Sequence, residues 1–164
     1  KERIRRVSRK LAETEGFESR DCGVRLFELS KSCFKTWEGS SADIDDQDLI
    51  DRIAAHGDHV SSSATSEDIL FELLLKDGFP LTVPMQRLQV AGKEVFSIAE
   101  GALLICLDQE LTQELMDALA EMEPARVICL DAGFKGNDQL KANAVQTFKA
   151  RARTKETAIE FRTV

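Results

Sequence analysis

Hydrophobic positions recur along the chain with the period of helices in some segments and of strands in others. Residues 2–14 place Ile4, Val7 and Leu11 on one helical face with arginines around the rest, and Gly16 stands where a helix is expected to stop. The same periodicity predicts further helices over residues 49–56, 68–76, 111–122 and 138–151.

Strands are predicted where apolar residues alternate with polar ones or form short continuous runs. Gly23–Leu29 alternates and predicts a half-buried strand, followed by an aromatic turn at Phe34 and Trp37. Residues 86–107 hold three strand-sized runs joined by tight Ala-Gly and Glu-Gly turns, which indicates an antiparallel hairpin unit. Two final strands are expected over residues 126–130 and 157–164.

The order of these elements sets the fold class. Strand, helix, strand, helix and strand follow one another over residues 102–164, the pattern of parallel pairing with helices packed on the sheet. We therefore predict an α/β fold with a mixed, mostly parallel sheet, an antiparallel hairpin unit and a Rossmann-like three-layer arrangement. The chain of 164 residues is long enough for one such domain, expected at 17–164 behind a separate helix at 1–16.

The helix expected at 68–76 is apolar nearly all round. Thr65 and Asp68 have the spacing of a capping box at its start. A helix without a polar face is buried on more than one side, so we expect a partner surface here. The candidate interface residues are Ile69, Leu70, Phe71, Leu73 and Leu74.

Charge is unevenly distributed along the chain, whose formal net charge is −7. Both ends are basic and the body between them is acidic, which does not fit a nucleic-acid-binding module by bulk charge. Local contact with DNA phosphates is the alternative to ordinary solvated helix faces. The candidate phosphate-contacting residues are Arg3, Arg5, Arg6 and Arg9 near one end and Lys149, Arg151 and Arg153 near the other.

Composition and cysteine spacing exclude several classes of protein. No apolar run approaches the roughly 20 residues of a membrane span, and no signal peptide is recognisable. Cys22, Cys33, Cys106 and Cys129 form no C-x-x-C pair, so we expect reduced thiols in the cytoplasm and neither disulfides nor a zinc site. The chain does not begin with Met, and we expect a piece of a longer protein.

Metal and ligand sites receive little support from the sequence. His56 and His59 are expected to face solvent, and the acidic run at 43–48 lacks the glycine and terminal glutamate of a calcium loop. Asp131 follows a predicted strand at the edge where α/β sheets bind ligands, although backbone capping is the favoured role for it. A small-molecule site there would use Asp131, Gly133 and Asn137.

Recognisable sequence is concentrated in three segments, Leu26–Trp37, Phe71–Leu81 and Leu130–Lys149. The last of these reads DAGFKGNDQLKANAVQTFK after its leucine. In this order the segments resemble the Mod subunits of type III restriction–modification systems, with the last similar to the terminal signature of that family. The helix at 2–14 resembles the arginine-bearing helix that follows the family's cofactor-binding strands.

The resemblance implies that the parent protein methylates the exocyclic amine of adenine in duplex DNA with S-adenosylmethionine as cofactor. None of the nine glycines here forms a G-x-G pair, and the absence of tyrosine rules out an Asp-Pro-Pro-Tyr element. No catalytic, cofactor-binding or metal-binding residue is therefore carried over. By this resemblance, 1–16 is the trailing helix of the catalytic domain and 17–164 is the C-terminal domain.

The role implied for this chain is structural, with dimerisation included. Its expected partners are the rest of the methyltransferase chain, a second copy in a homodimer, the helicase–nuclease restriction subunit, and DNA in the full complex, without a membrane. Two alternatives stay open: a module that contacts the DNA backbone, and an independent small-molecule-binding α/β domain.

Overall fold

The computed structural model describes residues 2–14, 24–35, 60–154 and 158–164 of the chain. These residues belong to two compact units, Lys1–Lys31 and Ser32–Val164. The helix expected at 49–56, the two histidines and the acidic run at 43–48 lie outside the described residues. Within the described part of the chain, no helix is long and apolar enough to cross a membrane.

The smaller unit contains helix α1 (Glu2–Ala12), which confirms the helix predicted at the amino end. An ion pair of 3.0 Å joins Arg6 Nε to Glu2 one turn earlier. Residues 24–31 have no regular secondary structure, so the strand predicted over 23–29 is wrong for the residues described. A strand needs a neighbour that pairs with its backbone, and no described strand pairs with this segment.

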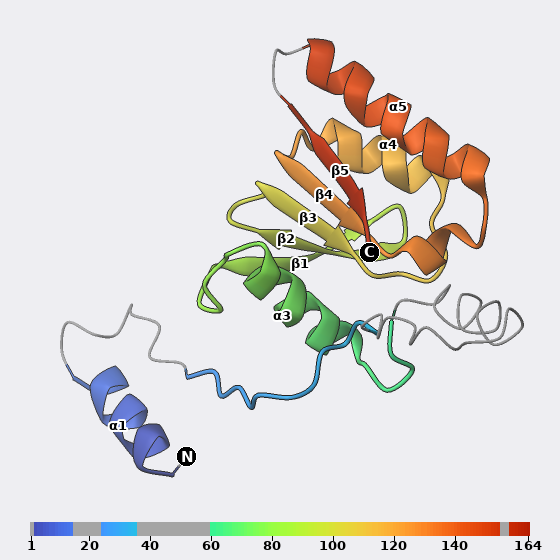
Figure 1. Cartoon of the computed structure of the whole chain (residues 1–164). Helices are drawn as coiled ribbons and strands as arrows, with labels where there is room; N and C mark the ends of the chain where they lie inside the picture. The colour runs from blue at the N-terminus through green and yellow to red at the C-terminus, as the bar shows by residue number, and fades with distance from the viewer. Residues whose placement is uncertain (1, 15–23, 36–59, 155–157) are drawn as a thin grey trace, which may run out of the picture. The chain divides into compact units, whose positions relative to one another are not determined.

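The larger unit is an α/β domain, as predicted (Figure 1). Its elements in chain order are α3 (Ser66–Lys76), β1 (Met85–Val90), β2 (Lys93–Ile98), β3 (Leu103–Cys106), α4 (Gln113–Glu121), β4 (Arg126–Cys129), the 3-10 turn η1 (Asp131–Phe134), α5 (Asp138–Thr154) and β5 (Glu160–Thr163). Each helix and strand predicted between residue 68 and the end of the sequence therefore exists, with bounds shifted by a few residues.

The five strands form one mixed sheet in the order β1-β2-β3-β4-β5. β2 pairs antiparallel with β1 and with β3, which confirms the hairpin unit. β3, β4 and β5 pair in parallel, as the strand–helix alternation predicts. Parallel pairs are thus half of the four and not most of them. The strands also follow chain order, without the reversal that defines a doubly wound Rossmann sheet.

Helices cover both faces of this sheet (Figure 1). α4 and α5 connect consecutive parallel strands and pack on one face, where Leu115, Leu119 and Phe148 are buried. Connections between parallel strands are right-handed with few exceptions, and these two move along the sheet in the same direction, so their helices share one face. α3 packs on the opposite face against Phe96 and Ile105. Among the described residues it is the single helix of the third layer.

Side-chain caps fix where two of these helices begin. The Thr65 hydroxyl accepts a hydrogen bond from the Asp68 backbone N–H, and the Asp68 carboxylate accepts one from the Thr65 backbone N–H, which confirms the predicted capping box of α3. Thr112 caps α4 in the same way, with its hydroxyl accepting from the backbone N–H of Leu115.

Most of the candidate interface residues on α3 lie in the protein's own core. Four of them are buried: Ile69, Leu70, Leu73 and Leu74. The fifth, Phe71, is half-buried and packs against the same cluster. The sheet and the segments at 33–34 and 79–83 together surround α3, which accounts for its apolar pattern without a partner protein. Leu75, which is 58% exposed, is the large apolar side chain that α3 presents to the outside.

Candidate functional site

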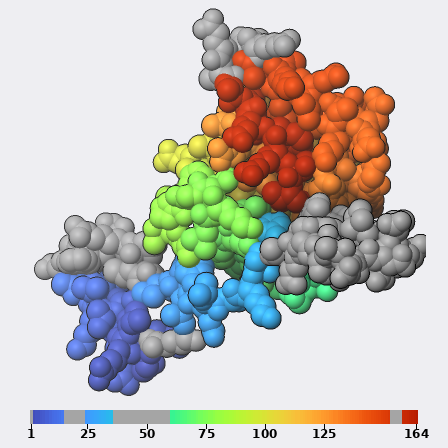
Figure 2. All heavy atoms as spheres, viewed as in Figure 1, coloured from blue at the N-terminus to red at the C-terminus, as the bar shows by residue number. Residues whose placement is uncertain are grey.

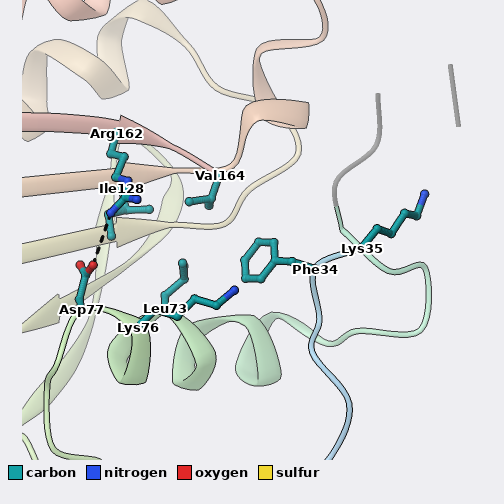
Figure 3. A pocket seen from close by; sticks show the side chains of 8 residues that line it. All are labelled: Phe34, Lys35, Leu73, Lys76, Asp77, Ile128, Arg162 and Val164. Atoms are coloured by element: carbon teal, nitrogen blue, oxygen red, sulfur yellow. Dashed lines mark ion pairs between the residues drawn. The ribbon is translucent and has the colours of Figure 1, made fainter. Parts of the chain in front are cut away.

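An open hollow of about 310 Å³ lies between the carboxyl-terminal half of α3 and the carboxyl ends of β4 and β5 (Figure 3). Leu73 from α3, Ile128 from β4 and Val164 beyond β5 give it apolar walls. The ring of Phe34 closes one side of it and is held there by a β-bridge between Phe34 and Val60. Four segments far apart in the sequence therefore build this hollow.

Three cations surround the hollow: Lys35, Lys76 and Arg162. Lys76 Nζ lies 4.1 Å from the centroid of the Phe34 ring, a cation–π distance, and 2.8 Å from a carboxylate oxygen of Glu72. The Arg162 guanidinium points toward Asp77, with 3.6 Å between the nearest nitrogen and oxygen (Figure 3). Two of these cations thus have carboxylate partners in the same chain, and Asp77 itself lines the hollow, so the charges around it do not select an anionic ligand.

Asp77 joins the end of α3 to two strands of the sheet. It is the C-cap residue of α3, and its side chain is only 7% exposed. The carboxylate accepts a hydrogen bond of 2.9 Å from Arg126, which also donates one of 2.8 Å to Glu160. The hydrogen bond to Asp77, opposed by partial desolvation, raises the pKa of Arg126 above its ordinary value. An enclosed carboxylate needs its partners, so this network fixes α3 on β4 and β5.

Glu72 holds the segment at residues 32–34 against α3. Its carboxylate accepts hydrogen bonds from the Ser32 hydroxyl at 2.5 Å and from the Cys33 backbone N–H at 2.6 Å, besides its pair with Lys76. Partial burial by itself raises the pKa of Glu72, but these donors outweigh it and lower the pKa to about 2. The position of Phe34 beside the hollow therefore depends on an ionised Glu72.

The described cysteines are buried thiols without the setting of a nucleophile. Burial, followed by the neighbouring Glu72, raises the pKa of Cys33 to about 11. Burial also raises the pKa of Cys106 and of Cys129, both of which are fully enclosed. Such thiols stay protonated near neutral pH. In the described ranges, no group of three or more His, Cys, Asp or Glu side chains is placed to hold a metal ion.

The candidate phosphate-contacting residues belong to the two different units. The arginines of α1 are all exposed: Arg3, Arg5, Arg6 and Arg9. In the larger unit, Lys149 and Arg151 are exposed on α5, and Arg151 lies 3.3 Å from Glu121 of α4. The Arg153 side chain is outside the described part of the structure. The charges at both ends are thus accessible within their own units.

The residues of the candidate small-molecule site have structural roles. The Asp131 carboxylate pairs with Lys141, and the Asp131 backbone N–H donates to the carbonyl of Val164. Asn137 caps α5, because its side-chain oxygen accepts from the backbone N–H of Leu140. Gly133 is packed so closely that an added Cβ would lie 2.5 Å from a backbone oxygen. The favoured interpretation of Asp131 as a capping residue stays a prediction, because the carboxylate pairs here with a lysine side chain.

Sequence reasoning did not identify the residues that build the hollow and its network. Asp77, Arg126 and Arg162 are ordinary charged residues far apart in the sequence, and only the order of the strands brings them together. The one local signal is that an apolar strand begins with an arginine at position 126. A charge at the start of a buried strand requires a partner, although the sequence does not say which one.

A search with family models finds no match to the chain, and no curated protein matches it. The resemblance in the three segments is therefore the basis for any family assignment, which belongs with the proposals below.

Proposed function

We propose that residues 32–164 are a structural domain of a DNA adenine methyltransferase of the type III modification kind. The domain contributes no catalytic residue and binds no cofactor. Methyl transfer from S-adenosylmethionine is assigned to the rest of the parent chain, which works in the cytoplasm. The proposal combines the resemblance in the three segments with the roles that their residues take in the fold.

One observation carries the structural role: within segment 130–149, Gly133, Asn137 and Phe148 are engaged in packing and capping. Gly133 fits between the loop at 108–111 and the sheet, and its carbonyl accepts a hydrogen bond of 2.9 Å from the Leu111 backbone N–H. Asn137 caps the helix that follows. Phe148, a residue of that helix, is 1% exposed and packs in the core between the helix and the sheet. Residues kept for chemistry would instead direct polar atoms toward an open site.

The second segment, 71–81, supports the same role. Glu72 holds the chain before residue 36, and Asp77 holds two strands through Arg126 and Arg162. Gly78 then reverses the chain with φ of 78°, a conformation that favours glycine. The residues that resemble the family are thus those that connect the third layer to the sheet.

In this proposal the domain braces the catalytic part of the same chain and contributes to a homodimer. The dimer in turn recruits the helicase–nuclease restriction subunit and acts on duplex DNA.

Adenine methylation in cells tests the proposed function. Genomic DNA from cells that express the whole coding sequence containing this chain should gain N6-methyladenine within one short sequence, measured by mass spectrometry and methylation-sensitive cleavage. Gly133→Ala should lower the methylation by lowering the amount of folded protein, and Gly136→Ala, at a position with no atom within 4 Å of the added Cβ, should keep more of it. Soluble wild-type protein without new methyladenine overturns the proposal.

The second candidate function is contact with the DNA backbone, favoured by the four exposed arginines of α1. Binding through phosphates weakens steeply as salt is raised. Retention of duplex DNA by the chain should therefore fall with salt and should fall further when Arg5 and Arg9 are both changed to Gln. Retention that ignores salt, or none at low salt, eliminates this role.

A further inference from the structure

Strand β5 is an edge of the sheet (Figure 1), and in the described residues no strand pairs with its outer side. Figure 2 shows atoms of the last residues, in the darkest red, at the surface of the molecule. The opposite edge is β1, the outer strand of the hairpin unit. Unpaired edges are templates for another strand, so the two edges can be compared for what they would accept.

The backbone of β5 presents alternate residues to its two sides. The Glu160 N–H donates to the Ala125 carbonyl, the Val164 N–H donates to Cys129, and the Val164 carbonyl accepts from Asp131. Residues 160, 162 and 164 therefore face β4, and the N–H and carbonyl groups of residues 159, 161 and 163 face outward. Phe161 stands at the centre of this outward-facing row.

The side chains of β5 are sorted by charge between the two faces of the sheet. Glu160 and Arg162 lie on the α3 face, where they pair with Arg126 and Asp77. Phe161 lies on the other face and stacks on Phe148 with ring centroids 5.0 Å apart. The α3 face of this edge thus carries one acid and one base, two residues apart, with the aromatic residue between them on the opposite face.

We propose that β5 pairs antiparallel with β5 of a second copy of this chain, about a two-fold axis through Phe161. In this register the two Phe161 residues exchange both backbone hydrogen bonds, because their N–H and carbonyl groups face outward. Glu160 then stands directly opposite Arg162 of the partner, and Arg162 stands opposite the partner's Glu160. The sheet becomes continuous across the dimer, as a two-fold interface between identical patches requires.

Charge complementarity selects both this register and this partner. On the α3 face, the row across the interface reads Arg126, Glu160 and then Arg162 of the partner, so each charge has opposite neighbours. A two-fold axis at Arg162 would instead place two arginines opposite each other, which is unfavourable. The self-complementary pair Glu160 and Arg162 therefore identifies a second copy of the chain as the occupant.

The other face of the same interface is apolar. Phe161 would meet its symmetry mate, with Phe148 stacked behind it and Phe134 in edge contact at 6.4 Å. Aromatic pairs directly across two strands stabilise their pairing. Ile159, which is partly buried beside this cluster, would stand opposite Thr163 of the partner.

This inference deepens the homodimer of the proposed function, and the chain of residues 1–164 tests it directly. Sedimentation over a concentration series should give a dimer for the wild type. Glu160→Arg and Arg162→Glu should each weaken the dimer about ten- to thirty-fold, because two opposite-charge pairs become like-charge pairs. An equimolar mixture of the two variants should dimerise again, since each chain then offers the charges that the other lacks.

Arg87→Glu is the matched control, because Arg87 is a 62% exposed arginine on the opposite edge strand and its loss should leave the dimer intact. Amide exchange supplies a readout without substitution: the Phe161 and Thr163 amides should become protected as concentration rises, and the Arg162 amide should be protected throughout. A monomeric wild type, folded variants that dimerise as well as the wild type, or a folded mixture that stays monomeric overturns the edge pairing. The methylation assay tests the proposed function independently of these measurements. A protein that methylates DNA but is monomeric overturns only the edge pairing, and a dimer without methylation overturns only the proposed function.

Discussion

Replacing Gly133 by alanine should destabilise the larger unit by about 2–4 kcal/mol. The added Cβ would lie 2.5 Å from the Asp108 carbonyl oxygen and 2.8 Å from Leu111 Cγ, well inside van der Waals contact. Overpacking of this kind costs about 1–3 kcal/mol, because the neighbours must move. If η1 moves away, the hydrogen bond from the Leu111 N–H to the Gly133 carbonyl is weakened, which adds about 1 kcal/mol.

The matched control is Gly136→Ala, three residues further along the same loop. Its Cβ would have no atom within 4 Å, but its φ of 71° disfavours any side chain. That strain costs about 1–2 kcal/mol. Both substitutions restrict the unfolded chain equally, so the entropic gain of alanine cancels between them. The difference between the two variants is therefore the cost of the close contact at Gly133 minus the backbone strain at Gly136.

Urea unfolding followed by far-ultraviolet circular dichroism gives the two free energies, provided that the slopes agree with the wild type. Gly133→Ala should unfold at a lower urea concentration than Gly136→Ala, and both below the wild type. Equal midpoints, or a Gly133→Ala variant within about 0.5 kcal/mol of the wild type, would refute close packing between η1 and the loop at 108–111.

Three further predictions concern the residues around the hollow. Asp77→Asn should cost about 1–3 kcal/mol in urea unfolding, because it weakens the partner of Arg126; the exposed control Glu67→Gln should cost under about 0.5 kcal/mol. The pKa of Glu72, about 2 in the folded state against 4.5 for the free side chain, gives stability that is present above pH 4.5 and lost as pH falls toward 2. In Glu72→Gln the urea midpoint should change less with pH between 4.5 and 2 than it does in the wild type. If the midpoints of the two proteins change equally with pH, the lowered pKa of Glu72 is contradicted. Cys33, with its pKa raised to about 11, should resist iodoacetamide at pH 8 until urea unfolds the protein, as peptide mapping can show; rapid labelling of folded protein argues against its burial.

Helices and strands from residue 66 onward could be predicted because each buries one face on the same sheet. The fourfold spacing of Leu115 and Leu119 reflects one side of α4 packed on the sheet, and Leu111, just before the helix, belongs to the same core cluster. The turn between β1 and β2 has positive φ at both Ala91 and Gly92, the geometry that glycine in a two-residue hairpin turn indicates. Periodicity and turn residues were enough to predict a helix or strand wherever the element that it contacts follows closely in the chain.

What the sequence did not predict has a common physical cause. A pattern of apolar and polar residues shows that a segment packs or pairs, but not which other segment it contacts. Alternation over 24–29 describes a strand face, yet no described strand pairs with that segment. The apolar pattern of α3 correctly predicts burial on several sides, but it does not say that the protein's own sheet supplies most of that burial. The network of Asp77 with Arg126 and Arg162 depends on strand order, which composition and periodicity leave open.

The burial of α3 changes where a second copy of the chain would bind. With Leu70 and Leu74 enclosed in the core, this helix keeps little apolar surface for an interface of useful size. The faces of the sheet are covered by helices, so the sheet has its edges left for pairing. On β1, Arg87 lies near Glu67 and Glu94 of its own chain, and on β5 Glu160 and Arg162 likewise pair with Arg126 and Asp77. On β5, Glu160 and Arg162 are spaced to meet each other across a two-fold axis, which is why the proposed dimer uses this short charged strand and not the long apolar helix.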